Sequence, residues 1–263
     1  MNPIDISICI VTFKERASDI KRLISQIQSD TESDGVDIVL AINGNNNELM
    51  DEQYRKEMLQ LCHDTPNCYP IVCPEFKSLP KLWNTLAIFS RTEYNFFLCD
   101  DVEYTNTNII QQVKQHIEKT SDSFFTINGG FSYFVLTKTI LHDLKYFDER
   151  LIAHGEEDGD MVHQFIKHTG KEMNNISISG LHNKASYSKE SNPKEMEFHV
   201  HNKPKFNREF SRLKYENNPN GIRGMNPTPI SVRSGMEVLQ QYPYEEFVRK
   251  NKHNIAKFER VVM

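Results

Sequence analysis

The chain has 263 residues, of which 38% are hydrophobic and 25% charged, and its formal net charge is −5. This length suits one large α/β domain, or one domain with an appendage, and the hydrophobic content excludes wholesale disorder. The mildly acidic charge balance argues against general nucleic-acid binding.

The first half of the chain alternates short apolar runs with helical patterns. The N-terminal stretch "MNPIDISICIVTF" lacks the basic start of a signal peptide and is interpreted as a strand over 6–13. Ser18 is predicted to cap the helix that follows, in which apolar residues recur at helical spacing. Further elements are expected as strands over 36–43, 68–74, 94–100 and 124–128, and as helices over about 48–62, 78–91 and 107–119.

This alternation predicts the fold class. Strands joined to helices by short loops indicate an α/β fold with a parallel, doubly wound sheet flanked by helices. Ligands of such sheets bind outside the carboxyl ends of the strands. Three polar clusters lie at expected strand ends, namely "TFKER" from Thr12, "NGNNN" from Asn43 and "CDDVE" from Cys99. We therefore expect a ligand crevice at that edge of the sheet.

The second half is organised differently. Residues 129–144 are predicted to form a turn, a strand and the start of a helix. Residues 146–170 lead into a helix that ends at Gly170, because glycine suits the left-handed conformation after a helix. A further strand is expected over 174–180.

The C-terminal part of the chain is polar and rich in Asn, Lys and Pro. Residues 183–232 have little periodicity and are too long for an ordinary loop. They form an active-site lid, a partner surface or a partly disordered segment. A final amphipathic helix over about 235–252 suits either homo-oligomer formation or peripheral contact with the inner face of the cytoplasmic membrane.

The five cysteines are an odd number, and no pair has zinc-ribbon spacing. They are interpreted as reduced thiols, which indicates a cytoplasmic protein. No stretch approaches the length of a transmembrane helix.

Two acidic clusters are candidates for chemistry. In "CDDVE", Asp100, Asp101 and Glu103 follow a strand, and Mg²⁺ typically takes one or two carboxylates together with substrate phosphates. The alternative is a solvated strand end. In "HGEEDGD", Glu157 and Asp158 open a helix, where the helix dipole favours anions. A carboxylate there is expected to be ionised near pH 7, as a general base requires, and the alternative role is helix capping.

Other polar residues near strand ends carry weaker signals. Glu15 and Arg16 follow the first strand, where they could hold a nucleotide base or ribose, or be ordinary surface charge. Lys81 could reach a phosphate and Asn84 could turn inward, or both could face water. His182 directly follows a strand, and a lone histidine there is either a metal ligand or a structural residue.

In their order and spacing, these segments resemble the GT-A fold glycosyltransferases of the inverting family-2 type, among them bacterial capsule and lipopolysaccharide enzymes. The resemblance covers about residues 5–190 and rests on "TFKER", "NGNNNE", "LPKLWN", "LCDDV", "FDERLIAHGEEDGD" and His182. It implies a Rossmann-like, mostly parallel sheet flanked by helices as a catalytic domain over 1–182. An irregular and helical extension over 183–263 is expected on the acceptor side of the same domain.

The resemblance also implies roles for individual residues. Asp101 matches the acid of the DxD motif that binds Mn²⁺ or Mg²⁺, and His182 matches a histidine that completes the metal coordination. Asp158 matches the catalytic base, with Glu157 beside it. Cys99 stands where the first acid of DxD is expected. The remaining matches belong to the nucleotide site: Thr12, Phe13, Glu15, Arg16, Asn43, Asn45, Lys81, Asn84 and Asp100.

The implied activity is transfer of a hexose or N-acetylhexosamine from a nucleoside-diphosphate sugar, with UDP as the family's usual nucleotide. The expected acceptor is a hydroxyl of a glycan or lipid-linked oligosaccharide in bacterial surface polysaccharide synthesis, and the expected outcome is inversion. One alternative is a nucleotidyltransferase or hydrolase, but "TFKERASD" lacks the glycines of a nucleotidyltransferase loop. The other is a non-catalytic carbohydrate-binding protein, and the presence of both Asp101 and Asp158 disfavours it.

Overall fold

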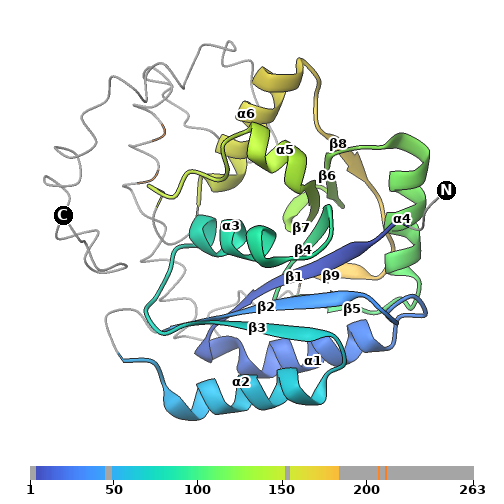
Figure 1. Cartoon of the computed structure of the whole chain (residues 1–263). Coiled ribbons are helices and arrows are strands. Elements are labelled where there is room, and N and C mark those ends of the chain that lie inside the picture. Colours follow the sequence, from blue (N-terminus) through green and yellow to red (C-terminus); the bar gives the residue numbers. More distant parts are fainter. Residues whose placement is uncertain (1–3, 45–48, 152–154, 184–206, 208–210, 212–263) are drawn as a thin grey trace, which may run out of the picture.

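Runs of apolar and β-branched residues form one central sheet of seven strands, in the order β3-β2-β1-β4-β7-β6-β8 (Figure 1). The computed structural model describes residues 4–44, 49–151 and 155–183, together with Asn207 and Ser211. The strands are β1 (Ile6–Thr12), β2 (Asp37–Asn43), β3 (Cys68–Cys73), β4 (Tyr94–Cys99), β6 (Phe124–Ile127), β7 (Gly130–Thr137) and β8 (Asn174–Ile176).

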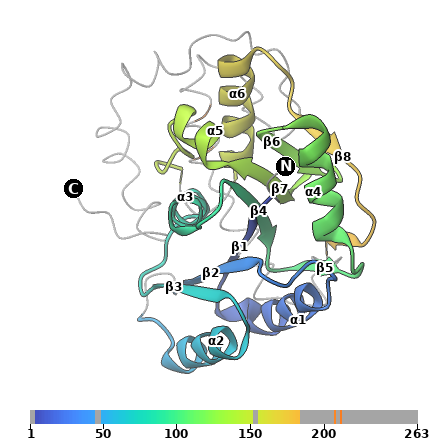
Figure 2. The ribbon, with the colours of Figure 1, turned by 45° about the vertical axis from the view of Figure 1, so that its right-hand side comes forward.

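Helices cover both faces of this sheet, and each face has its own hydrophobic cluster (Figures 1 and 2). One cluster packs the sheet against α1 (Ala17–Gln28), α2 (Glu52–Asp64) and α4 (Ile109–Thr120). The other packs it against α3 (Leu79–Phe89), α5 (Lys138–Asp143) and α6 (Glu157–Thr169). The helices expected from apolar spacing are confirmed within a few residues, and Gly170 follows α6 with a φ of 67°.

The carboxyl ends of three parallel strands meet at one edge of the sheet. In the ladders around β1, Thr12 pairs with Ile42 of β2, and Val11 pairs with Cys99 of β4. The strand ends at Thr12, Asn43 and Cys99 therefore lie side by side. This confirms the expectation that the three polar clusters share an edge.

The sheet is not wholly parallel, because β7 runs antiparallel to both β4 and β6. The reason lies in a tight turn at Asn128 and Gly129, whose φ values are 50° and 81°. Such a turn joins neighbouring strands as a hairpin, whereas a parallel pair needs a long crossover. The reversal brings the first residues of β7, Phe131 among them, to the edge where β4 ends.

Two short strands were not expected from the sequence. β5 (Val102–Tyr104) and β9 (Leu181–Asn183) form a separate antiparallel pair. β8 ends at Ile176, earlier than the strand expected over 174–180. The prediction that Ser18 caps α1 is wrong. A short 3-10 helix, η1 (Lys14–Arg16), follows β1, and α1 starts at Ala17.

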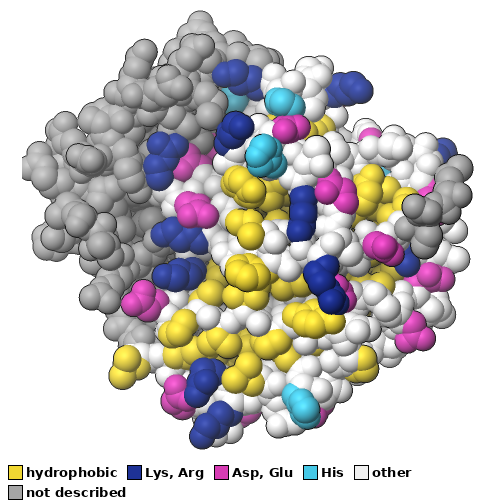
Figure 3. Space-filling view, viewed as in Figure 1, with side chains coloured by type: hydrophobic (Ala, Val, Ile, Leu, Met, Phe, Trp, Pro, Cys, Tyr) yellow, Lys and Arg dark blue, Asp and Glu magenta, His cyan; other side chains and the backbone are white. Residues whose placement is uncertain are grey.

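Charges of both signs are interspersed with apolar side chains over the described part of the face in Figure 3. Among the described residues, no helix is long and apolar enough to span a bilayer. The segment over 183–232 and the helix expected over 235–252 lie outside the described residues, apart from Asn183, Asn207 and Ser211.

Candidate active site

A cavity of about 240 Å³ opens at the edge where β1, β2 and β4 end. One part of its wall is apolar and includes Trp83 of α3 and Phe131 of β7. The other part is polar, with side chains that come from strand ends, from η1 and from α6. These polar lining residues are Arg16, Asn43, Lys77, Cys99, Asp100, Asp101, Glu157 and Asp158.

Arg16 is the buried cation of this cavity. Because η1 turns the chain back after β1, the Arg16 side chain points inward and only 2% of it is exposed. Its Nη1 atom lies 3.0 Å from Asp101 Oδ2 and 3.9 Å from Asp19 Oδ2. Its guanidinium carbon lies 5.8 Å from the centre of the Phe13 ring. The arginine therefore neutralises one of the two adjacent aspartates at the end of β4, as buried charges require.

Asp100 is the second aspartate, and it is 5% exposed. Burial raises the pKa of its carboxyl well above the usual range. The charge on Arg16 and the Thr12 hydroxyl oppose this rise, while the charge on Asp101 adds to it. Among the described residues, no group hydrogen-bonds to Asp100 Oδ2. A buried oxygen left in this way is a place where a cation or a donor hydroxyl gains a contact.

Glu157 and Asp158 face the same cavity from the first turn of α6. Burial, with a further contribution from Asp158, raises the pKa of Glu157 to about 8. The prediction that a carboxylate at this helix start is ionised near pH 7 is therefore wrong for Glu157, because desolvation outweighs the helix dipole. Burial also raises the pKa of Asp158, while the Gly159 backbone N–H, which donates to Asp158 Oδ1 at 2.7 Å, opposes this rise.

Asn43 lines the cavity, but its amide serves to hold a loop. Its Nδ2 donates to the Lys77 carbonyl at 3.0 Å, and its Oδ1 accepts from the Lys77 N–H at 2.9 Å. A side chain at Gly44 would place Cβ 2.4 Å from the Pro74 carbonyl oxygen. The hydrogen bonds of Asn43 and the close approach at Gly44 hold the end of β2 against the loop that follows β3. These contacts bring the Lys77 side chain to the cavity.

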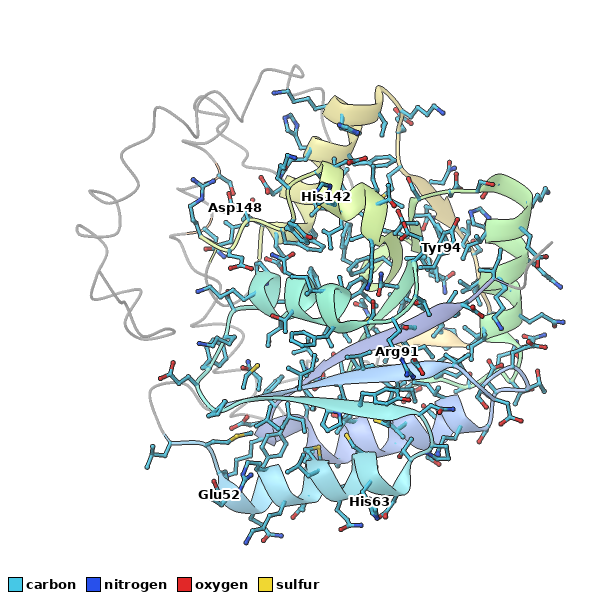
Figure 4. The ribbon with its side chains drawn as sticks, viewed as in Figure 1. Glu52, His63, Arg91, Tyr94, His142 and Asp148 are labelled. Atoms are coloured by element: carbon cyan, nitrogen blue, oxygen red, sulfur yellow. The ribbon has the colours of Figure 1, made fainter. Side chains whose placement is uncertain are left out.

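Asn84 does not line the cavity and instead holds the segment that precedes α6. Its Nδ2 donates to the Phe147 carbonyl at 3.0 Å and to Glu149 Oε1 at 2.9 Å, and its Oδ1 accepts from the Phe147 N–H at 3.0 Å. Figure 4 shows the neighbouring Asp148 beside the start of α3. The structure thus gives Asn84 a scaffolding contact, and its predicted nucleotide contact remains a prediction.

Glu15, Lys81 and Thr12, three other predicted site residues, are absent from the cavity lining. Glu15 is exposed, and Lys81 is half-buried in the first turns of α3. Asn45 lies outside the described residues. Thr12, at the end of β1, is fully buried.

His182 is exposed on β9, where it pairs with Glu103 of β5, and it lines a different groove. Within the described ranges, no group of three or more His, Cys, Asp or Glu side chains is arranged to hold a metal ion. A Mg²⁺ or Mn²⁺ ion that shares its coordination with phosphates needs only one or two carboxylates. The Asp100 oxygen without a partner and the adjacent Asp101 supply such donors, so this cavity fits the predicted ion.

Sequence reasoning missed Lys77, Trp83 and Phe131. Lys77 follows β3, which is the next parallel strand at the same edge, so the rule that ligands bind at strand ends would have found it. Trp83 belongs to the apolar spacing of α3 and carries no signal of its own. Phe131 reaches the cavity only because β7 is reversed, and no local pattern reveals that direction.

The sequence matches no family model, and no curated protein matches it significantly. Solved structures match it in fold. S. aureus TarS matches over 70% of this chain and 37% of TarS, with a TM-score of 0.56 and 12% identity. S. aureus TarS 1–349 in complex with UDP matches over 67% of this chain and 61% of the other, with a TM-score of 0.52 and 12% identity.

A third match is the mannosyltransferase PcManGT from Pyrobaculum calidifontis in complex with GDP-Man and Mn²⁺. It covers 66% of this chain and 54% of PcManGT, with a TM-score of 0.52 and 9% identity. The chain spans less than two thirds of the length of each of these proteins. At such low identity the likeness shows the fold alone. The chain therefore has the GT-A fold, a mostly parallel α/β sheet flanked by helices, as in PcManGT and TarS.

Proposed function

We propose that this chain is a metal-dependent glycosyltransferase, which moves a sugar from a nucleoside-diphosphate sugar to an acceptor hydroxyl. One observation carries the proposal: two pairs of acids, Asp100 with Asp101 and Glu157 with Asp158, line a single cavity at the carboxyl edge of the sheet. The two pairs suit two tasks, one at the diphosphate and one at the acceptor hydroxyl. The UDP, GDP-Man and Mn²⁺ bound by the fold's relatives support this assignment.

The first task is to hold the diphosphate. Asp101, with Asp100 beside it, would hold Mn²⁺ or Mg²⁺, which when bound supplies charge neutralisation on the departing nucleoside diphosphate. Lys77 and Arg16 are the cations of the cavity wall, and both can balance phosphate charge. Phe13 offers an aromatic surface at the same edge, where the nucleotide base is expected.

The second task is to activate the acceptor. Asp158 accepts the proton of the acceptor hydroxyl as that oxygen bonds to the anomeric carbon. The bond between that carbon and the phosphate oxygen breaks, and the nucleoside diphosphate leaves with the electron pair. Attack from the face opposite the leaving group inverts the anomeric configuration. The raised pKa of Asp158 makes it a stronger proton acceptor than an ordinary aspartate. Trp83 and Phe131 limit the entry of water, which would otherwise hydrolyse the donor.

The finer assignments rest on the resemblance of the sequence motifs to family 2. They are UDP as the nucleotide, a hexose or N-acetylhexosamine as the donor sugar, and a glycan or lipid-linked acceptor in bacterial surface polysaccharide synthesis. The catalytic unit is proposed to span 1–182, with 183–263 as an acceptor-side extension. His182 lines a groove rather than this cavity, so the proposed metal site rests on Asp101 and Asp100.

Calorimetry with UDP and Mn²⁺ tests the two tasks separately. We expect Asp101→Ala to abolish manganese-dependent UDP binding, because it removes a metal ligand. We expect Asp158→Ala to leave UDP binding within about twofold and to abolish transfer, since a general base contributes about 10²–10⁴ to rate. Glu103→Ala is the matched control, because Glu103 lies in the same segment but lines no part of the cavity. Unchanged affinity in the Asp101 variant would contradict the metal assignment.

A thermal-shift panel separates an enzyme from a scaffold and identifies the nucleotide. We expect one of the UDP, GDP, dTDP and CMP sugars to raise the melting temperature, and Mn²⁺ to increase that shift. Release of the free nucleoside diphosphate should then follow when an acceptor is added. A panel without any shift would remove the basis for the proposed function.

A further inference from the structure

A second groove, of about 720 Å³, lies between α4 and the connection from β8 to β9, and it shares no lining residue with the cavity. Its volume is within the range of small-molecule sites. The polar lining residues come from α4, from the turn before β7, from β7, from the β8–β9 connection and from β9. They are Gln112, Asn128, Tyr133, Ser177, Ser179, His182 and Asn183.

The wall of this groove is held in place before any ligand arrives. Asn128 donates from Nδ2 to the carbonyls of Ile178 at 2.7 Å and Leu181 at 3.1 Å, and its Oδ1 accepts from the Ile178 N–H at 2.9 Å. Gly180 has a φ of 90°, and a Cβ there would lie 2.4 Å from Asn106 Cβ. Only glycine fits this close approach, which fixes the wall against the start of α4.

Tyr133 provides a buried polar group that opens into the groove. It is 6% exposed, and it lines the groove. It also lies close to the end of β4, because it pairs with Leu98 across the β4–β7 ladder. Burial raises the pKa of Tyr133, and the charges of Cys99 and Asp101 add to the rise. The groove therefore lies beside the metal-binding end of the cavity.

Over the part of the chain that the structure describes, the lining of the groove is polar and carries no Asp, Glu, Lys or Arg. A phosphate or nucleotide would be expected to recruit Arg or Lys, whereas amides, hydroxyls and an imidazole donate to and accept from neutral hydroxyl groups. Ile178 and Leu181 also line the groove, but both are buried in the core beneath it, so the lining that a ligand meets is mainly polar. Such a lining fits a polyhydroxylated, uncharged ligand.

We propose that this groove binds a neutral saccharide. This proposal rests on the proposed function: the bound saccharide is part of the acceptor of that reaction, and the acceptor is therefore a neutral glycan. β5 directly follows Asp101 and pairs with β9, so the groove and the cavity flank the same strand end. A glycan held in the groove is thereby kept next to the place where its end would react.

The test uses the intact chain and three uncharged disaccharides, lactose, maltose and N,N′-diacetylchitobiose, in saturation-transfer NMR titrations. At least one is expected to bind. Ser177→Trp, at an exposed position, should fill the groove and abolish binding. Tyr133→Phe, which keeps the ring, should weaken affinity about fivefold, as loss of one hydrogen bond does. Asn174→Ala in β8, outside the groove lining, is the matched control and should bind like the parent.

Calorimetry with UDP and Mn²⁺ on the same samples separates the two proposals. Disaccharide binding that Ser177→Trp abolishes supports the groove even if UDP fails to bind, in which case the proposed function alone is wrong. UDP binding without any disaccharide signal overturns the groove. Signals that persist unchanged in both groove variants, or tighter binding of glucose 1-phosphate than of every disaccharide, also overturn it. Circular dichroism of each variant confirms that it folds.

Discussion

Glu157 shows how a single buried carboxyl changes the behaviour of the site. Its Oε2 has no hydrogen-bond partner among the described residues, and its pKa is about 8. Near pH 7 the folded chain therefore keeps the proton on most of the Glu157 carboxyl groups. A protonated carboxyl in the cavity is a hydrogen-bond donor, so in the proposed reaction Glu157 would donate to an oxygen of the sugar while Asp158 accepts the acceptor proton.

The stability of the protein should fall with rising pH because of this residue. The unfolded chain has a Glu157 pKa near 4.5, so between about pH 4.5 and 8 the folded state binds more protons than the unfolded state. In that window the free energy of unfolding decreases, by on the order of a few kcal/mol at full effect. We expect a shallower fall in Glu157→Gln than in the parent, with part of the fall remaining because burial also raises the pKa values of Asp100 and Asp158.

Urea unfolding at pH 5, 7 and 8.5, without metal or nucleotide, measures the difference. The exposed Glu103→Gln is the matched control and should follow the parent. Equal slopes of stability against pH in the parent and in Glu157→Gln would contradict the raised pKa.

At the scale of elements, side-chain clamps decide which segments reach the cavity. η1 turns Arg16 inward, Asn43 ties the loop after β2 to Lys77, and Asn84 ties α3 to Phe147 ahead of α6. The Asn43 and Asn84 clamps pair backbone groups that would otherwise lack partners. Asn84, which lies outside the cavity, thereby fixes Phe147 ahead of α6.

Breaking the clamp from α3 should destabilise the fold measurably. Asn84→Ala removes three hydrogen bonds and leaves the buried N–H and C=O of Phe147 without partners, which costs about 2–4 kcal/mol. The neighbouring Thr85→Ala loses only a bond to the Lys81 carbonyl within the same helix and should change stability by less than about 0.5 kcal/mol. Urea unfolding of both variants checks this, and equal losses would contradict the clamp.

The elements were largely predictable because most of them contain long, regular apolar patterns. β5 and β9, of three residues each, are too short for such a pattern, and the direction of β7 depends on a turn and on tertiary pairing. The acids of the cavity were predictable from their place at strand ends and at a helix start. The partners of Arg16, Asn43 and Asn84 were not, because each contact joins positions far apart in the sequence.

At the scale of the whole molecule, two hydrophobic clusters hold helices on both faces of one sheet, without covalent cross-links. All five cysteines are free, and three are buried. Cys62 and Cys68 lie close enough for their thiols to hydrogen-bond, which lowers the pKa of Cys62 and, together with burial, raises that of Cys68. The stability of the fold therefore does not depend on disulfide bonds.

Reducing agents should leave this stability unchanged. We expect the same urea midpoint with and without dithiothreitol, and mass spectrometry after alkylation under denaturing conditions should show five modified thiols. A lower midpoint in the presence of reductant, or fewer modified thiols, would reveal a disulfide and contradict this conclusion.

The central place of β1 in the sheet has a consequence for how the protein is made. Ile6 pairs with Tyr94, so one side of β1 stays open on the ribosome until β4 has been synthesised. Such long-range pairing slows folding and exposes an unpaired strand edge to aggregation in the meantime. When β4 docks, Asp101 arrives beside Arg16 in the same step. The nascent chain thus gains the β1–β4 ladder and this buried ion pair together, whereas Phe131, Glu157 and Asp158 of the cavity are added later. A product that stops before β4 has neither the ladder nor the ion pair.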